Sequence, residues 1–245
     1  MKEGTYNTIK HWDNDIVLKF MSNEVDTLIN YLTSNNIQSL SFIDIGGNVG
    51  KWYDELSKRF TINHCEIIEP SKELCEYMGI KFKDNPNVTI HNFGLSNENG
   101  EFNFVQDTIS SLENNGLDLS NEEVNLGLSA GRFDWDENDF DKTKFYSSDY
   151  YFENICKIPI KEIGFIKMDT ENRDMEILLS MTNFLSNNKI RPVIMFERNC
   201  VHYMSLIDAQ KLVDDFCDKV GYRHSNLEWS GDNVLLIPIN ETTNP

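Results

Sequence analysis

The stretch Phe42-Ile43-Asp44-Ile45-Gly46-Gly47-Asn48-Val49-Gly50 joins a short apolar run to a glycine-rich turn. The apolar residues 40–45 predict a buried strand, and residues 51–60 after the turn have helical character. Glycines allow a backbone to approach a ligand closely, and the first turn of a helix offers free N–H groups. We therefore predict a strand, a ligand-binding turn and a helix, the opening unit of an α/β fold.

The same alternation of strands and helices continues through the rest of the chain. Further apolar runs predict strands at residues 65–68, 88–90, 163–168 and 193–196. Apolar residues at helical spacing occur at 14–33, from 71 onward, at 175–185 and at 205–220. Residues 222–227 and 233–237 predict a terminal antiparallel pair. Such an order is typical of βαβ units that build a doubly wound, mostly parallel sheet.

Composition excludes several classes of protein. The chain has 245 residues, 40% hydrophobic and 25% charged, which suits one α/β domain. Its net charge of −18 argues against a nucleic-acid-binding protein, because phosphate contacts need a basic surface. No apolar run approaches the roughly 20 residues that span a membrane. The sequence begins without an apolar leader, and its five cysteines form no CxxC pair, so we expect a cytoplasmic protein with reduced thiols.

We expect a single domain over residues 1–245, with an N-terminal helical segment at 1–38 and an insertion at 107–154. The insertion has no clear period and combines acidic with aromatic side chains. An irregular stretch of this length is usually a functional lid or a flexible segment, and its aromatic residues argue against full disorder. Its rings would suit the face of a sugar and its carboxylates a sugar's hydroxyls. The alternative is a solvated acidic surface with a few anchoring aromatic residues.

Two carboxylates accompany the predicted turn. The spacing G-G-x-x-G differs from the G-x-G-x-x-G with which dinucleotide enzymes hold a pyrophosphate. Asp44, just before the glycines, disfavours a pyrophosphate and suits an ammonium group such as that of S-adenosylmethionine. Glu69 ends the next strand, where a carboxylate can accept both hydroxyls of an adenosine ribose. NAD would use the same residue, so Glu69 indicates a nucleoside without identifying it.

Further carboxylates follow the later strands. The strand at 163–168 delivers Asp169 to the sheet edge that carries the two carboxylates above. Methyl transfer to a hydroxyl must remove a proton, which makes Asp169 the first candidate for a base. Glu171 and Asp174 follow where a helix should begin, so helix capping is an alternative to a catalytic role. Glu197 ends the next strand; it could share Mg²⁺ or Mn²⁺ with Asp169, or be buried with a hydrogen-bonding partner.

From about residue 40 to 237, the ordered motifs resemble those of the FkbM-type methyltransferases. Asp44–Gly50 is similar to the family's D-x-G-x-N-x-G motif, including Asn48 where other methyltransferases tend to have glycine. Ile68-Glu69-Pro70 is similar to the family's F-E-P, and Asn92–Asn97 to its A-L-S-D segment. Ser110-Ser111-Leu112 is similar to S-S-L, and Ile166–Glu171 to I-K-I-D-V-E. Met195-Phe196-Glu197 fits a later strand of the family that ends in glutamate. After Glu171 the family usually continues G-x-E, whereas this chain has Asn172 and Asp174.

The resemblance implies a class I methyltransferase fold, which is Rossmann-like and doubly wound, with seven mostly parallel strands and an antiparallel C-terminal strand. It also implies S-adenosylmethionine as cofactor and O-methylation of a carbohydrate or another small hydroxyl compound. Catalytic candidates are Asp169, Glu171 and Glu197, and a divalent cation would be held by Asp169 and Glu197. The cofactor would be bound by Asp44, Gly46, Gly47, Asn48, Gly50, Glu69, Asn92, Phe93, Ser111 and Asp169.

Two functions from other classes stay open at this point. An NAD-linked oxidoreductase would share Glu69, but the missing G-x-G-x-x-G spacing and the presence of Asp44 count against it. A non-catalytic binding protein would keep the fold without turnover, and retention of Asp44, Glu69 and Asp169 counts against that. We expect His91, which ends a strand near the predicted adenine, to be structural rather than catalytic. The identity of the acceptor and the oligomeric state do not follow from the sequence.

Overall fold

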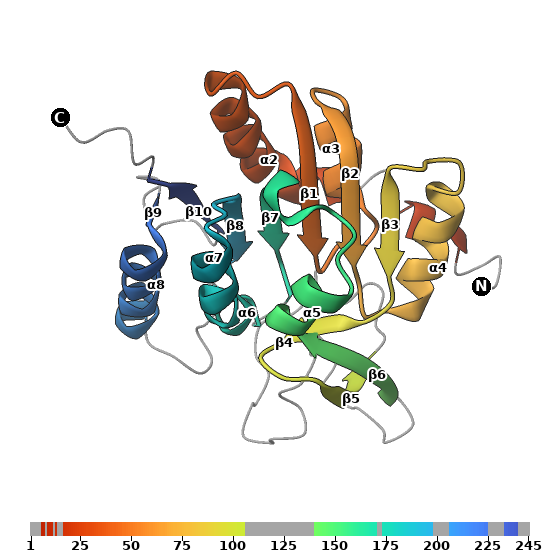
Figure 1. Ribbon diagram of the computed structural model, residues 1–245. Helices are drawn as coiled ribbons and strands as arrows, with labels where there is room; N and C mark the ends of the chain where they lie inside the picture. Colours follow the sequence, from red (N-terminus) through yellow and green to blue (C-terminus); the bar gives the residue numbers. More distant parts are fainter. Residues whose placement is uncertain are drawn as a thin grey trace.

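A computed structural model describes residues 6–7, 9–11, 13, 17–105, 140–170, 173–197, 206–224 and 233–239. Its centre is a seven-stranded sheet with helices on both faces, and a small three-stranded sheet lies at one end (Figure 1). The α/β class predicted from the alternating pattern is therefore confirmed.

The large sheet has the strand order β3-β2-β1-β7-β8-β10-β9. All neighbours are parallel except that β10 runs antiparallel to both β8 and β9. Strand order reverses between β1 and β7, and in such sheets ligands bind beyond the carboxyl ends of the strands at this point. The mostly parallel sheet with an antiparallel C-terminal strand is as predicted. The strands are β1 (Ser39–Ile45), β2 (Thr61–Ile68), β3 (Val88–His91), β7 (Ile163–Met168), β8 (Val193–Glu197), β9 (Tyr222–His224) and β10 (Asn233–Pro238).

Two hydrophobic cores cover the two faces of this sheet. Along β1, Leu40 and Phe42 pack on one face, and Ile43 and Ile45 pack on the other, as the period of two in a strand requires. The first face carries α2 (Val17–Ser34), α3 (Lys51–Ser57) and α4 (Lys72–Lys81). The second carries α5 (Ser148–Asn154), α6 (Asp174–Ser180), α7 (Thr182–Asn188) and α8 (Leu206–Val220), and a single 3₁₀ turn, η4 (Ile160–Glu162), leads into β7.

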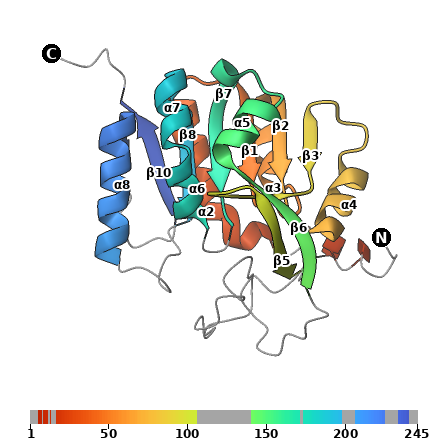
Figure 2. The same cartoon turned by 60° about the horizontal axis from the view of Figure 1, so that its bottom comes forward.

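The small sheet has the order β4-β6-β5, formed by β4 (Gly94–Ser96), β5 (Gly100–Val105) and β6 (Phe140–Ser147). Strand β4 is parallel to β6, whereas β5 is antiparallel to it. Figures 1 and 2 show this sheet beyond the end of the large sheet toward which β1, β2 and β3 point. The small sheet therefore stands next to the edge at which a ligand is expected.

Two expectations about elements need correction. The end of the expected irregular insertion, residues 140–154, forms β6 and α5, because β6 pairs with β4 and β5 from much earlier in the chain. The helix expected over 175–185 is interrupted at Met181 and forms α6 and α7. The rest of the insertion, residues 107–139, lies outside the described residues, so its role as a lid stays a prediction. In the described part of the chain, every helix is too short or too polar to cross a membrane.

Candidate active site

The glycine turn connects the end of β1 to the start of α3 in a conformation that few residues adopt. Gly46 and Gly50 have φ of 72° and Asn48 has φ of 51°, a left-handed region that glycine adopts freely and asparagine more readily than most residues. A Cβ atom built on Gly46 would lie 1.9 Å from the backbone oxygen of Asp169. The turn thus packs directly against the residue that follows β7, which brings the predicted cofactor loop beside the predicted base.

Asp44 is a buried carboxylate that lacks a hydrogen-bonding partner among the described residues. Its exposed fraction is 0%, and neither carboxylate oxygen accepts a hydrogen bond from any residue that the structure describes. The Nζ of Lys167 stands 3.5 Å from Oδ1, an ion-pair distance longer than a normal hydrogen bond. Burial raises the pKa of Asp44, and the charge of Lys167 opposes that rise. Because buried carboxylate oxygens are almost always hydrogen-bonded, this pair of oxygens indicates a ligand with donors.

Lys167 was not among the predicted site residues, yet it links two of them. Its buried Nζ lies 3.3 Å from Oδ2 of Asp169 and donates a hydrogen bond to the Gly46 carbonyl oxygen at 3.1 Å. Burial alone would lower the pKa of Lys167, but the nearby carboxylates of Asp169, Asp44 and Asp174 raise it above its usual value. In the sequence, Lys167 is a lysine inside an otherwise apolar strand, and such a lysine normally indicates a position that faces solvent.

Glu69 ends β2 at the expected place and holds the backbone around the turn. Its Oε2 accepts a hydrogen bond from the Asn48 N–H at 2.9 Å, and its Oε1 accepts one from the Ser71 N–H at 2.8 Å. Burial raises the pKa of Glu69 to about 7. Each oxygen keeps a second lone pair for a ligand hydroxyl. Glu69 therefore supports the turn and still has the capacity to bind a ribose.

Asn92 and Phe93 follow β3 at the same edge, but their side chains have structural partners. The Asn92 amide donates to the backbone oxygens of Glu69 and Pro70, at 3.2 and 2.9 Å. Phe93 is buried in the core that covers the second face of the sheet. His91 is also buried, and its Nε2 lies 2.7 Å from Oε2 of Glu66, which agrees with a structural role.

Asp169 and Asp174 differ sharply in exposure. The side chain of Asp169 is 44% exposed, so its carboxylate opens outward from the Lys167 ion pair. Asp174 is buried, and its Oδ2 accepts hydrogen bonds from the Thr170 N–H at 3.1 Å and the Thr170 hydroxyl at 3.0 Å. Burial and the neighbouring Asp169 raise the pKa of Asp174 to about 7. In α6, Asp174 is the first helical residue, and the N-cap is Arg173.

The remaining predicted residues receive less support. Glu171 and Ser111 lie outside the described residues, so their roles stay predictions. Glu197 ends β8 as expected and faces Asn233 of β10 in the sheet register. No group of three or more His, Cys, Asp or Glu side chains that could hold a metal ion occurs in the described part of the chain. The described residues therefore give no support for a cation held by Asp169 and Glu197.

The structure places Asp44, Glu69 and Asp169 at the carboxyl ends of three adjacent strands, β1, β2 and β7. Lys167 connects Asp44 with Asp169, and Asn48 connects Glu69 with the glycine turn. Three carboxyl groups stand with one ammonium group at this edge, and this excess of acidic groups favours a cationic ligand and disfavours a pyrophosphate.

A model of the methyltransferase FkbM domain matches residues 44–223 of the chain. A search of curated proteins finds no significant match. Among solved structures, methyltransferase FkbM from Methylobacillus flagellatus KT is similar with a TM-score of 0.47 and 16% sequence identity, over 81% of this chain. This chain spans 43% of that protein's length.

Two further solved structures are similar over most of both chains. A SAM-dependent methyltransferase from Aquifex aeolicus has a TM-score of 0.44 and 13% identity, over 94% of this chain and 95% of its own. A precorrin-6y C5,15-methyltransferase from Geobacter metallireducens GS-15 has a TM-score of 0.41 and 12% identity, over 86% of this chain and 84% of its own.

Proposed function

The chain belongs to the FkbM family of S-adenosylmethionine-dependent methyltransferases, and from this premise we propose that it methylates a hydroxyl oxygen of a carbohydrate or another small hydroxyl compound. The family resemblance and the aromatic and acidic composition of residues 107–154 support this acceptor class. Asp169, with its open carboxylate beside the glycine turn, gives the site a group that can take the hydroxyl proton.

The residues at the sheet edge fit S-adenosylmethionine. The two oxygens of buried Asp44, which accept no hydrogen bond from the described residues, suit the donors of its ammonium group, and the excess of acidic groups at the edge suits its overall positive charge. Glu69 offers acceptors for the ribose hydroxyls. Gly46 and Gly47 let the turn pack where a Cβ atom would lie 1.9 Å from the Asp169 backbone oxygen and 2.2 Å from the Ile67 side chain. When bound, the cofactor supplies an electrophilic methyl group on a positively charged sulfur.

The chain's own residues have three tasks in this reaction. Asp169 accepts a hydrogen bond from the acceptor hydroxyl and takes its proton as the oxygen becomes nucleophilic. Lys167 holds Asp169 and Asp44 at fixed positions, because its buried ammonium group lies within ion-pair distance of both. The glycine turn fixes the cofactor side against the Asp169 backbone, so both partners are held in one orientation. Alignment of this kind can lower a barrier by about 7–11 kcal/mol.

The single observation that carries the proposal is the buried carboxylate of Asp44, which accepts no hydrogen bond from the described residues, and a thermal-shift comparison tests it. A ligand at about 100 times its Kd adds ~2.7 kcal/mol to the free energy of unfolding. At roughly 2–4 °C per kcal/mol, we expect S-adenosylmethionine or S-adenosylhomocysteine to raise the Tm by about 5–11 °C. NAD should leave the Tm unchanged. A response to NAD alone would indicate an oxidoreductase and contradict the proposal.

The acceptor requires a second experiment. Nucleotide sugars, free glycans and small hydroxyl compounds are incubated with the protein and a cofactor that carries a radiolabelled methyl group. We expect transfer of the label to a hydroxyl oxygen, located by mass spectrometry of the product. Binding of S-adenosylmethionine without any transfer would favour a binding protein, and label on nitrogen or carbon would contradict O-methylation.

A further inference from the structure

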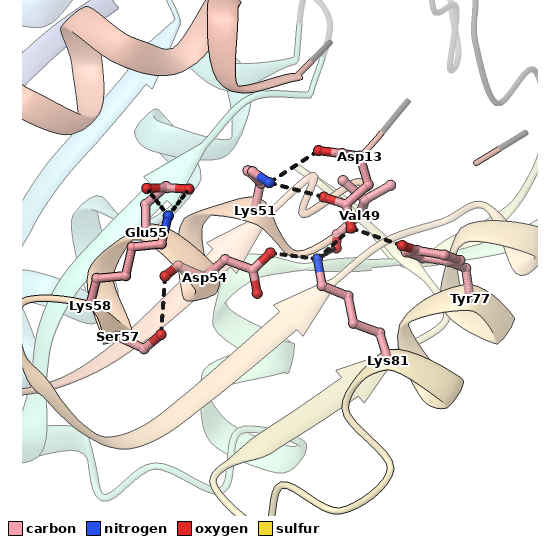
Figure 3. Close-up of polar contacts among 9 residues, drawn as sticks. All are labelled: Asp13, Val49, Lys51, Asp54, Glu55, Ser57, Lys58, Tyr77 and Lys81. Carbon is pink, nitrogen blue, oxygen red and sulfur yellow. Dashed lines mark hydrogen bonds and ion pairs between the residues drawn. The ribbon is translucent and has the colours of Figure 1, made fainter. Parts of the chain in front are cut away.

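A further buried carboxylate, Asp13 of the N-terminal segment, lies between two lysines near Val49 of the glycine turn (Figure 3). Its exposed fraction is 3%. Its Oδ2 accepts hydrogen bonds from Lys81 Nζ and from the Tyr77 hydroxyl, both at 2.8 Å. Lys51 Nζ donates to the Asp13 backbone oxygen at 3.0 Å and stands 3.4 Å from Oδ1. Asp13 therefore fastens two lysines that come from different helices.

Both lysines are connected to the glycine turn, Lys51 as its neighbour in the chain and Lys81 by a hydrogen bond. Lys51 is the first residue of α3, directly after Gly50. Lys81, at the end of α4, donates a hydrogen bond to the Val49 backbone oxygen at 2.8 Å and pairs with Asp54 at 2.6 Å (Figure 3). Val49 lies between two residues of positive φ, where the backbone needs outside contacts to hold its conformation. The network therefore reaches from Asp13 to the part of the turn that the cofactor would approach.

The N-terminal segment is anchored beside this network by apolar contacts. Ile9 is 2% exposed and belongs to the core beneath α2, α3 and α4. The ring of Tyr6 lies 5.4 Å from the ring of Tyr77, centroid to centroid. The segment is thus held to α4 by packing, and Asp13 adds the charged contacts. Removing the Asp13 charge would leave the two lysines with one fewer carboxylate, so that Lys81 would keep Asp54 and Lys51 would lose its ion pair with Asp13, which weakens the network at that place.

We propose that Asp13 is a positioning residue for the cofactor turn: it fixes Lys51 and Lys81, and through them the backbone of residues 48–50, in the conformation that binds S-adenosylmethionine. The inference rests on the proposed function, and Asp13 itself does not touch the ligand. Because coupling between two sites is reciprocal, cofactor binding must in turn hold the N-terminal segment more firmly.

Calorimetry with S-adenosylhomocysteine tests the first half of the inference. Couplings between sites are typically worth about 5–150-fold in affinity, so Asp13→Asn should raise the Kd at least ~5-fold. The matched control is Glu55→Gln, which removes a charge of the same sign from α3, where Glu55 forms an ion pair with Lys58 at 2.7 Å (Figure 3). The control should keep the wild-type Kd. Asp13→Glu, which retains the charge, should recover part of the lost affinity.

Hydrogen exchange of the wild-type protein tests the second half and needs no variant. Adding S-adenosylhomocysteine should slow amide exchange in peptides that cover residues 9–13, and Asp13→Asn should abolish that protection. A folded Asp13→Asn protein with wild-type Kd would overturn the inference, as would unprotected residues 9–13 in a wild-type protein that binds the ligand. If Asp13→Asn does not fold, the wild-type exchange decides. A wild type that binds no S-adenosylhomocysteine would instead overturn the proposed function, and the inference with it.

Discussion

Asp44 and Asp169 belong to the same ion-pair group around Lys167, but their surroundings predict separate roles. Asp44 is fully buried and lacks hydrogen-bond donors in the described residues, whereas the carboxylate of Asp169 is open. Asp44 lies beside the glycine turn, where a Cβ atom on Gly47 would lie 3.3 Å from its Oδ2, and this position assigns it to the cofactor. The exposed carboxylate of Asp169 can contact the acceptor.

Substituting these two residues should therefore separate binding from turnover. Asp169→Asn should keep cofactor affinity within a few fold and lower turnover about 10²-fold or more, because the base is lost. Asp44→Asn should weaken cofactor binding, because hydrogen bonds to a charged group are worth about 1.5–3 kcal/mol each. Calorimetry with S-adenosylhomocysteine measures binding, and labelled methyl transfer to the identified acceptor measures turnover. Unchanged turnover in Asp169→Asn would remove Asp169 from the mechanism.

At the scale of single residues, the sequence predicts what stands at strand ends better than what stands within strands. Asp44, Glu69 and Asp169 could be placed together because parallel strands end at one edge. Lys167 could not, because the sequence does not show which side of a strand faces a site. Asp13 was also missed, since its partners Lys51 and Lys81 lie far along the chain and no local motif connects them.

At the scale of elements, the glycine turn and helix α4 give opposite expectations for one substitution, glycine to alanine. A methyl group on Gly46 would meet the Asp169 backbone oxygen at 1.9 Å and would require a left-handed φ. Strain at such a position costs about 1–3 kcal/mol before the clash is counted. Gly79 lies inside α4, where a methyl group would meet nothing within 4 Å.

We therefore expect Gly46→Ala to lower the Tm by at least about 2–4 °C and to abolish binding of S-adenosylhomocysteine. Gly79→Ala should leave binding unchanged and stabilise the protein by up to about 1 kcal/mol, because alanine favours a helix over glycine. Thermal unfolding and calorimetry of both variants measure these effects. Normal cofactor binding by Gly46→Ala would show that the turn is not packed against β7 as the structure has it.

Helices and strands could be predicted where neighbouring residues in the sequence carry the hydrophobic pattern. The strand β1 is a short apolar run closed by Gly46-Gly47, and β7 is one closed by Asp169, so both could be read directly from the sequence. The β6–α5 unit could not, because β6 acquires its identity from pairing with β4 and β5, which lie far away in the chain. Tyr151 and Phe152 of α5 were grouped with the aromatic residues of a lid, yet both are buried in the core.

At the scale of the whole molecule, the acidic character extends from the surface into the interior. The net charge of −18 belongs to the whole chain, but Asp44, Glu69 and Asp174 carry part of it at buried positions. Burial disfavours the charged form of each, so the cofactor edge raises the free energy of the ligand-free protein. A cationic ligand relieves that cost, and this relation connects the binding of the cofactor with overall stability.

The stability of the ligand-free protein should consequently fall as the pH rises from about 4.5 to about 7. The pKa values of Glu69 and Asp174 are raised to about 7 in the folded protein, above the ordinary 4.5 and 3.8 that apply when the chain is unfolded. In this window the folded state binds more protons than the unfolded state, so the free energy of unfolding decreases with pH. Each group contributes a slope of at most about 1.4 kcal/mol per pH unit.

Variants distinguish these two groups from the general repulsion of a highly negative chain. Glu69→Gln and Asp174→Asn should each flatten the dependence of unfolding free energy on pH, measured by urea unfolding between about pH 5 and pH 8. The matched control is Glu153→Gln, which removes one charge from an exposed position on α5 and should keep the wild-type slope. Because each of the three variants removes one carboxyl group from the chain, the burial of that group is what separates them. Equal slopes in all of them would mean that the buried carboxyls titrate normally and that the ligand-free edge carries no such strain.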